Sequence, residues 1–360
     1  MSPMRFRFLS SGVAAALLVA ACSGGPGTTP ASSSPVGAPS ASSSSATSST
    51  APSAAEPVKL TVGLGYIPSV QFAPFYLAQQ EGWYAEAGLE VEFQNKIDPD
   101  LIALVGQGTI DVGIGDGTSV IPAVSQGIPI RYLATVYGQS PNIVFAKASS
   151  GITTAADLKG RKIGTPGRYG SGWIMLQALL GSAGLTTDDV EISTYDKFTQ
   201  GVAVEQGVID AATGFANNEP VQMQLHGYNP VVLRIDDITP LPGPGLIAGT
   251  STLESKRDAI DAFTATTLRA MQAIIADPQV GLDAAIAAVP ELASARDAQL
   301  AVLNATIESW TGPVQASGGL GAIDRAGWTA SIEYMTTLGL VPNPVTVDDL
   351  IDVGSSRGNY

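Results

Sequence analysis

The sequence predicts an α/β protein with two similar lobes and a ligand cleft between them. The main observation is an internal repeat, because residues 107–115 read QGTIDVGIG and residues 206–214 read QGVIDAATG. Two further pairs of segments repeat in the same order, LTVGLG (60–65) with KIGTPG (162–167) and AGL (87–89) with AGL (183–185). Each copy has the order strand, Gly-containing turn, helix, strand, helix, strand, so each predicts one α/β lobe.

Length and composition allow two hydrophobic cores and argue against several classes of function. The chain has 360 residues with 45% apolar content, which is ample for two domains. A formal net charge of −14 disfavours nucleic acid, which binds basic surfaces. The chain has one Cys and one His, so it has no disulfide framework and no Cys/His zinc site. We therefore expect no catalytic residues, no metal and no cofactor.

Residues 1–22 are expected to be a targeting segment rather than part of the fold. Arg5 and Arg7 form a positive n-region, and the apolar stretch 8–20 that follows is too short to span a bilayer. The segment ends in VAAC, which resembles a bacterial lipobox that is cut before its Cys and lipidated. We expect lipid anchoring through Cys22 at the outer face of the cell membrane, with ordinary secretion as the alternative.

Residues 23–57 are rich in Ser, Ala, Thr, Pro and Gly, which predicts a disordered tether. The first lobe then begins near Val58. Alternating or β-branched runs predict strands at 59–65, 89–93, 110–114, 132–137 and 142–146. Apolar residues at helical spacing predict helices at 75–86 (split at Gly82), 99–105 and 120–126.

The second lobe is expected over residues 148–242, and the first over residues 58–147 and 243–360. The second lobe should contain a short helix at 155–160, a strand at 162–164, a helix at 173–183 and a strand at 231–235. The Pro- and Gly-rich segment 241–245 then leads to a strand at 246–250 and helices at 256–276, 279–289, 295–310 and 324–338. These helices carry no chemistry-bearing residues, so we expect them to pack on the first lobe.

In open α/β sheets, ligands bind beyond the carboxyl ends of the strands, which here selects the loops 66–72, 115–119, 166–173 and 215–219. Their aromatic faces, together with amide and carboxylate groups, suit a planar heterocycle with ring nitrogens and carbonyls. Arg168 is placed to stack on such a ring or to pair with an anion. The candidate ligand-binding residues are Tyr66, Gln71, Phe72, Asp116, Thr118, Tyr137, Arg168, Tyr169, Gly170, Trp173, Phe215, Asn217, Asn218 and Glu219.

Several candidates also have a purely structural interpretation. Trp173 is equally consistent with a core position, and Phe72 with a wall between loop and helix. Asp116 is suited to cap the helix that follows it, and Asn218 to cap a helix that begins with Glu-Pro. The segment PGRYGSG (166–172) is not a P-loop, because it lacks the GK[ST] ending.

Four stretches resemble the solute-binding subunits of bacterial ABC importers for thiamine-pyrimidine precursors and riboflavin. They are YIPSVQFAPFYLAQQEGWYAEAGLEVEF (66–93), DLIALVGQGTIDVGIGDG (100–117), ADLKGRKIGTPGRYGSGW (156–173) and GFANNEPVQMQLHGY (214–228). The resemblance implies a type II periplasmic-binding-protein-like fold and capture of a vitamin between the lobes. It also implies ABC permease and ATPase subunits as partners. The segments QFAPFY and PGRYGSGW look closest to the riboflavin-binding members.

The same family resemblance extends to fungal pyrimidine synthases and to sulfonate and taurine binders. The synthases look to need a Lys and a His after the first QGxID-like strand and a Cys-rich loop further on. Here these segments read GDGTS (115–119) and LPGPG (241–245), so we predict that the chain is not an enzyme. A binder of an alkanesulfonate or another small anion is the alternative, although Arg168 is its one obvious anion partner. A sensor that reports to a membrane kinase is not distinguished from an importer subunit.

Overall fold

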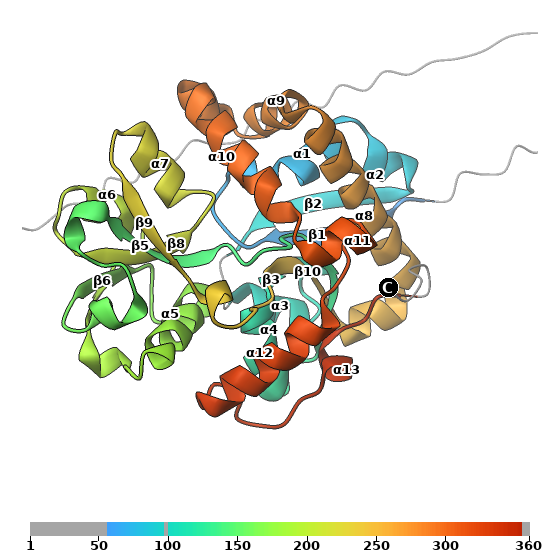
Figure 1. Cartoon of the computed structure of the whole chain (residues 1–360). Coiled ribbons are helices and arrows are strands. Elements are labelled where there is room, and N and C mark those ends of the chain that lie inside the picture. The colour runs from blue at the N-terminus through green and yellow to red at the C-terminus, as the bar shows by residue number, and fades with distance from the viewer. Residues whose placement is uncertain (1–55, 97–99, 355–360) are drawn as a thin grey trace, which may run out of the picture. The chain divides into compact units, whose positions relative to one another are not determined.

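The computed structural model describes residues 56–96 and 100–354 (Figure 1). The predicted targeting segment 1–22, with Cys22, and the tether as far as residue 55 lie outside the described residues. Within the described part, no helix is both long enough and apolar enough to cross a membrane.

The described residues form two five-stranded sheets of the same design. The first has the order β2 (Leu89–Asn95), β1 (Val58–Leu64), β3 (Val112–Asp116), β10 (Pro244–Gly249), β4 (Ile130–Thr135). The second has the order β7 (Glu191–Thr194), β6 (Lys162–Thr165), β8 (Ala211–Phe215), β5 (Asn142–Lys147), β9 (Pro230–Arg234). In each sheet the first three strands are parallel and the fourth runs antiparallel to both of its neighbours. The predicted α/β class is therefore confirmed.

The repeated QGxID motif has the same structural role in both lobes. Asp111 Oδ2 accepts a hydrogen bond from the Thr61 backbone N–H at 2.9 Å, and Asp210 Oδ2 accepts one from the Lys162 N–H at 2.8 Å. The glycine of each copy ends a helix with φ of 73° in the first lobe and 72° in the second, a left-handed conformation that favours glycine. The motif therefore stops a helix and fixes the first strand beside the third.

The helices follow the predicted order. Gly82, with φ of 72°, separates α1 from α2 as expected. In the first lobe the helices are the 3-10 turn η1 (Val70–Phe72), α1 (Ala73–Gln80), α2 (Trp83–Glu86), α3 (Asp100–Gly106) and α4 (Gly117–Ser125). In the second they are η2 (Ala148–Ser150), η3 (Ala155–Leu158), α5 (Gly170–Ser182), η4 (Thr187–Asp189), α6 (Gln200–Glu205), α7 (Glu219–Leu225) and η5 (Ile235–Asp237). The C-terminal part holds α8 (Thr250–Ala276), α9 (Pro278–Ala288), η6 (Pro290–Ala295), α10 (Arg296–Trp310), α11 (Pro313–Gly318), α12 (Arg325–Thr337) and α13 (Val347–Leu350).

The chain crosses between the sheets earlier than the sequence indicates. Strand β5 pairs with β8 and β9, so residues 142–147 belong to the second sheet and not to the predicted first lobe 58–147. The predicted position of this crossing, near Ala148, is therefore wrong. Residues 142–146 are all buried, because β5 lies inside the second sheet and helices α5 and α6 pack on it. An apolar run predicts burial of this kind without naming the sheet that provides it.

The C-terminal helices do more than cover the first lobe. As expected, α8 packs on α1 and α2, where the Phe263 ring stacks on Phe75 and Tyr84. Helix α12, however, also reaches the second lobe, where Tyr334 Oη donates to the Ala178 carbonyl at 2.9 Å. Helix α10 lies beside α7 of the second lobe, as Figure 1 shows. These helices therefore join the lobes outside the two crossings.

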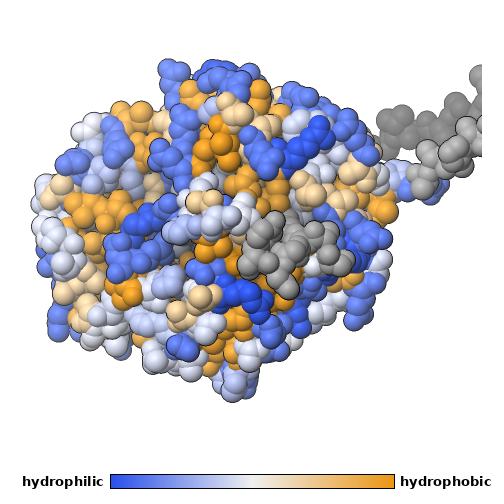
Figure 2. All heavy atoms as spheres, turned by 45° about the vertical axis from the view of Figure 1, so that its right-hand side comes forward, coloured by the Kyte–Doolittle hydropathy of each residue, from blue (hydrophilic) through white to orange (hydrophobic). Residues whose placement is uncertain are grey.

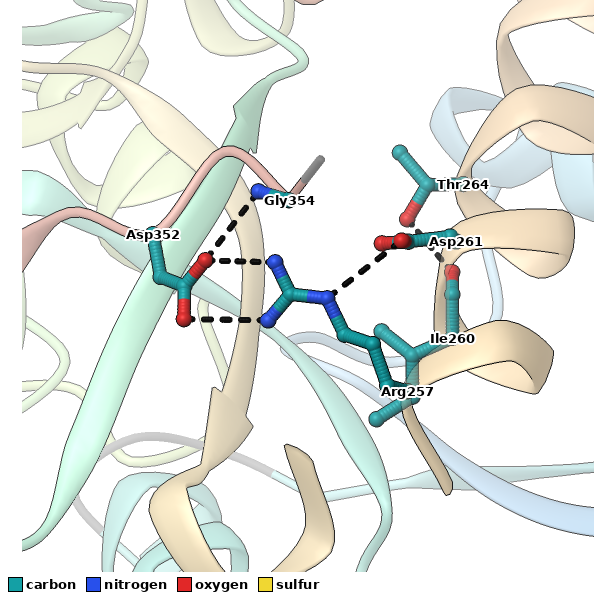
Figure 3. Close-up of polar contacts among 6 residues, drawn as sticks. All are labelled: Arg257, Ile260, Asp261, Thr264, Asp352 and Gly354. Atoms are coloured by element: carbon teal, nitrogen blue, oxygen red, sulfur yellow. Dashed lines mark hydrogen bonds and ion pairs between the residues drawn. The ribbon is translucent and has the colours of Figure 1, made fainter. Parts of the chain in front are cut away.

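An ion-pair cluster fastens the end of the described chain to α8 (Figure 3). Arg257 donates two parallel hydrogen bonds to the Asp352 carboxylate, at 3.0 and 2.5 Å, and a third from Nε to Asp261 at 3.3 Å. Asp352 also accepts from the Gly354 backbone N–H at 3.1 Å.

On the face shown in Figure 2, apolar residues form separate patches among hydrophilic ones.

Candidate functional site

A cavity of about 160 Å³ lies between the two sheets, at the loops that follow their parallel strands. All four loops singled out from the sequence contribute to it. The predicted residues that line it are Tyr66, Gln71, Phe72, Asp116, Tyr137, Tyr169, Gly170, Trp173, Phe215, Asn218 and Glu219. Apart from Tyr137, all of these residues come from the four loops that the sequence analysis selected.

Three predicted residues do not line the cavity. Thr118 lies inside α4 and is fully buried. Arg168 is exposed and is not part of the cavity lining, and its guanidinium lies over the Trp173 ring, 5.6 Å from the ring centroid. Asn217 is buried in a contact between the lobes. Thr118 and Asn217 are therefore buried away from the cavity, and Arg168 contacts the Trp173 ring instead.

The cavity residues that the sequence reasoning missed include Asn142, Phe198, Gln200 and Thr213. Asn142 was missed because its strand was given to the wrong lobe. Phe198 follows β7, which pairs in parallel with β6, so it also lies beyond the carboxyl end of a parallel strand. That position was the available signal, and the loop after β7 was not among the four considered.

Asp116 joins the lobes instead of capping a helix. It occupies the N-cap position of α4, but its side chain makes no capping hydrogen bond. Its Oδ1 accepts from the Asn142 side-chain amide at 3.0 Å, across the gap between the sheets. Asn142 Oδ1 in turn accepts from the Ser171 hydroxyl at 3.2 Å. This polar chain runs along one wall of the cavity.

A second set of contacts between the lobes centres on Asn217. Its side-chain amide donates to Gln71 Oε1 at 3.0 Å and to Thr306 Oγ1 at 2.8 Å. The Tyr137 hydroxyl also donates to Gln71 Oε1, at 3.4 Å. All four side chains are buried. The loop after β8 is therefore hydrogen-bonded to both η1 and α10 of the first lobe.

Glu219 is the carboxylate at the second-lobe wall of the cavity. Its Oε2 accepts from the Phe215 backbone N–H at 2.9 Å and its Oε1 from the Gln200 side-chain amide at 3.3 Å. Burial raises the pKa of Glu219 from 4.5 to about 7, against the opposing effect of the Phe215 hydrogen bond. Near neutral pH this group is therefore present both as a carboxylate and as a carboxylic acid.

The neighbouring Asn218 occupies the N-cap position of α7 without making a side-chain capping bond. It accepts instead from Gln222 Nε2 at 2.7 Å, on its own lobe. The capping interpretation from the sequence therefore fits its position but not its hydrogen bond.

Aromatic rings from both lobes also line the cavity. Tyr66 of the first lobe and Phe198 of the second meet edge to face, with ring centroids 4.8 Å apart. Burial, with a smaller contribution from Glu219, raises the pKa of the Tyr66 hydroxyl, so it stays protonated and can donate a hydrogen bond. Trp173 and Phe215 are partly buried and also line the cavity. Rings and amides on both sides can hold a flat heterocycle.

The single His of the sequence lies on the surface of the second lobe. His226 is exposed and its Nδ1 lies 2.9 Å from Glu205 Oε1. It is not part of the cavity lining. Among the described residues no cluster of three or more His, Cys, Asp and Glu side chains is arranged to hold a metal ion.

The sequence model described as "NMT1/THI5 like" matches residues 69–280. The chain belongs to the NMT1/THI5-like family. This NMT1/THI5-like chain is 33% identical over 350 residues to the riboflavin-binding protein RibY of Chloroflexus aurantiacus, a match that covers 96% of each. It is 25% identical over 300 residues to the formylaminopyrimidine-binding protein of Halalkalibacterium halodurans, covering 80% of this chain and 88% of that protein. The predicted family resemblance is confirmed.

Synthases also belong among the relatives of this NMT1/THI5-like chain. The 4-amino-5-hydroxymethyl-2-methylpyrimidine phosphate synthase of Legionella pneumophila is 28% identical over 188 residues, which is 51% of this chain and 57% of that protein. Among solved structures, the alkanesulfonate-binding protein SsuA of Xanthomonas axonopodis pv. citri, bound to MOPS, superposes with a TM-score of 0.64 at 16% identity. The superposition covers 83% of this chain and 100% of that one. It confirms the predicted two-lobed periplasmic-binding-protein fold.

Proposed function

We propose that this chain is the extracytoplasmic solute-binding subunit of an ABC importer, and that it captures a planar heteroaromatic vitamin by closing its two lobes. Riboflavin is the favoured ligand, and a pyrimidine precursor of thiamine is the next. The observation that supports this most is the cavity between the lobes, where aromatic rings and amide groups from both lobes converge. The end-to-end likeness to a riboflavin-binding protein supports the choice of ligand.

The size of the cavity indicates how the ligand enters. Its volume of about 160 Å³ is below the range of roughly 300–1,000 Å³ common for small-molecule sites. A three-ring heterocycle therefore needs the lobes to separate and to close again around it. The lobes 58–141 with 243–354 and 142–242 are joined by two crossings, at about residues 136–141 and 238–243, which are the natural hinges.

The location and the partners follow from the same proposal. We expect lipidation of Cys22 to tether the chain to the outer face of the membrane, and the closed lobes to dock on permease and ATPase subunits. A catalytic role is not part of the proposal. The segment 115–119, at the end of β3 and the start of α4, contains no Lys or His, and His226 pairs with Glu205 outside the cavity.

Native mass spectrometry of the full chain purified in detergent tests the proposal directly, since a closed cleft retains its ligand. Addition of riboflavin to the ligand-free chain should quench flavin fluorescence and give a saturable binding curve. Titrations with formylaminopyrimidine and with MOPS belong in the same experiment. Binding of the sulfonate without any response to riboflavin or the pyrimidine would overturn the assignment in favour of a small-anion binder.

A further inference from the structure

Phe198 is the one described non-glycine residue with a positive φ. Its φ is 56°, in the left-handed region, where a bulky side chain crowds its own backbone. Such strain persists only where the surrounding structure imposes it, and it gathers at ligand sites. The reason for a phenylalanine at this position therefore has to be sought in its ring.

The loop around Phe198 is anchored on both sides. The Tyr195 backbone N–H donates to the Thr165 carbonyl at 2.8 Å, and the Phe198 N–H donates to the Tyr195 carbonyl at 3.0 Å. On the other side the buried Gln200 donates to the Thr213 carbonyl at 3.3 Å. The residues next to Phe198, Lys197 and Thr199, are both exposed. The left-handed turn thus directs one side chain inward between two that face solvent.

The ring does not serve the hydrophobic core of either lobe. The described residues form three hydrophobic clusters, and Phe198 neither belongs to them nor packs against them. It lines the cavity instead, where its ring meets Tyr66 of the opposite lobe at an interplanar angle of 80°. Tyr66 itself packs against the first-lobe cluster, so it is the fixed member of the pair.

We propose that Phe198 is a specificity-determining residue that closes with Tyr66 on the flat ring of the ligand and selects aromatic ligands over aliphatic ones. The inference rests on the proposed function, since it names what discriminates at that site. When the lobes open, the two rings separate, because each comes from a different lobe. When they close on a heterocycle, its faces and edges replace the contact that the rings make with each other.

Two substitutions separate this role from a structural one. Phe198→Leu keeps an apolar side chain but removes the aromatic face. Phe198→Gly removes the ring and also the strain, because glycine adopts positive φ freely. The matched control is Tyr228→Leu, an aromatic side chain of the second lobe that is 38% exposed and lies outside the cavity lining.

The experiment is a riboflavin titration of the full chain in detergent, together with thermal unfolding without ligand. Loss of one aromatic contact to a flat ring should raise the Kd about ten-fold in Phe198→Leu, while the control stays within two-fold of wild type. Phe198→Gly should lose at least as much affinity with no fall in the ligand-free Tm. A Kd for Phe198→Leu within two-fold of wild type overturns the inference.

The ligand-free measurement keeps the inference separate from the choice of vitamin. A ligand-free Tm several degrees lower in Phe198→Gly than in wild type also overturns it, since the ring would then be needed for folding. If the wild-type chain ignores riboflavin, the proposed ligand fails, and the unfolding result alone decides whether the ring is there for packing.

Discussion

Asn217 of the second lobe donates a hydrogen bond to Gln71 of the first at 3.0 Å, and both side chains are buried. The other amide hydrogen goes to Thr306 of α10 at 2.8 Å. One side chain from the loop after β8 is thus bonded to two separate elements of the opposite lobe. Both hydrogen bonds join side chains of the two lobes directly, so we expect them to favour the arrangement in which the lobes are in contact.

Replacement of Asn217 by Ala should therefore open the ligand-free protein. Each hydrogen bond contributes about 0.5–1.5 kcal/mol, so the loss of two shifts the balance of closed and open forms roughly ten-fold or more. Small-angle X-ray scattering without ligand should show a larger radius of gyration. Asn218→Ala is the matched control, because that neighbour bonds Gln222 on its own lobe. Identical scattering of wild type and Asn217→Ala would show that the contact does not hold the lobes together.

Glu219 should make the ligand-free protein less stable as the pH rises. Burial raises its folded-state pKa to about 7 from 4.5. A carboxyl whose folded pKa is raised contributes its full stability below pH 4.5 and loses it as the pH rises through 7. Glu219→Gln cannot ionise, so its Tm should exceed that of wild type more at pH 8 than at pH 5. In free energy of unfolding, the effect of ionising Glu219 amounts to at most about 3 kcal/mol.

The pH test needs the comparison of two proteins because other carboxyls titrate as well. Their contributions are common to wild type and Glu219→Gln and cancel in the difference of Tm values. A difference that does not change between pH 5 and pH 8 would mean that Glu219 keeps an ordinary pKa.

The Arg257–Asp352 pair should be worth more than an exposed ion pair. Arg257 makes two parallel hydrogen bonds to Asp352 and lowers the pKa of that carboxyl (Figure 3). Arg257→Met should reduce the free energy of unfolding by about 1 kcal/mol at pH 7, a figure kept low because the pair is partly exposed. Stability from a lowered carboxyl pKa is present above pH 4 and disappears as the pH falls through the folded value.

Urea unfolding at pH 7 and at pH 3 checks the Arg257 prediction. Arg325→Met is the control, because its pair with Asp348 has side chains that are 50% and 86% exposed. That substitution should change the unfolding midpoint little. Equal effects of the two substitutions at pH 7 would show that the Arg257–Asp352 pair stabilises the protein no more than an exposed ion pair does.

The sequence predicted the two lobes because the repeat contains residues with a fixed structural duty. The Asp of each QGxID copy accepts a hydrogen bond from the first parallel strand of its lobe, and a role of this kind leaves a repeated motif in the sequence. The sequence did not predict which sheet β5 joins, because an apolar run indicates that a strand is buried but not which strands it pairs with.

Side-chain direction in loops was equally hidden. Asn217 and Asn218 are adjacent and chemically identical, yet one faces the opposite lobe and the other its own helix. Asn218 has φ of −121° and ψ of −84°, and no neighbouring residue type predicts this backbone geometry. The left-handed backbone of Phe198 was also not predictable from the sequence, because such a conformation is imposed by the surrounding structure.

The repeated aspartates give a last prediction, in which equivalent residues should differ in their contribution to stability. Asp111 and Asp210 accept the same strand N–H bond, but Asp111 also pairs with Lys256 at 2.8 Å and has a side chain only 13% exposed. Asp210 is 38% exposed and lies 3.9 Å from Arg161. Asp111→Ala should therefore lower the free energy of unfolding by about 2–3 kcal/mol, and Asp210→Ala by about 1 kcal/mol. Urea unfolding of both variants measures the ranking, and a larger loss in Asp210→Ala would show that burial does not set the strength of this motif.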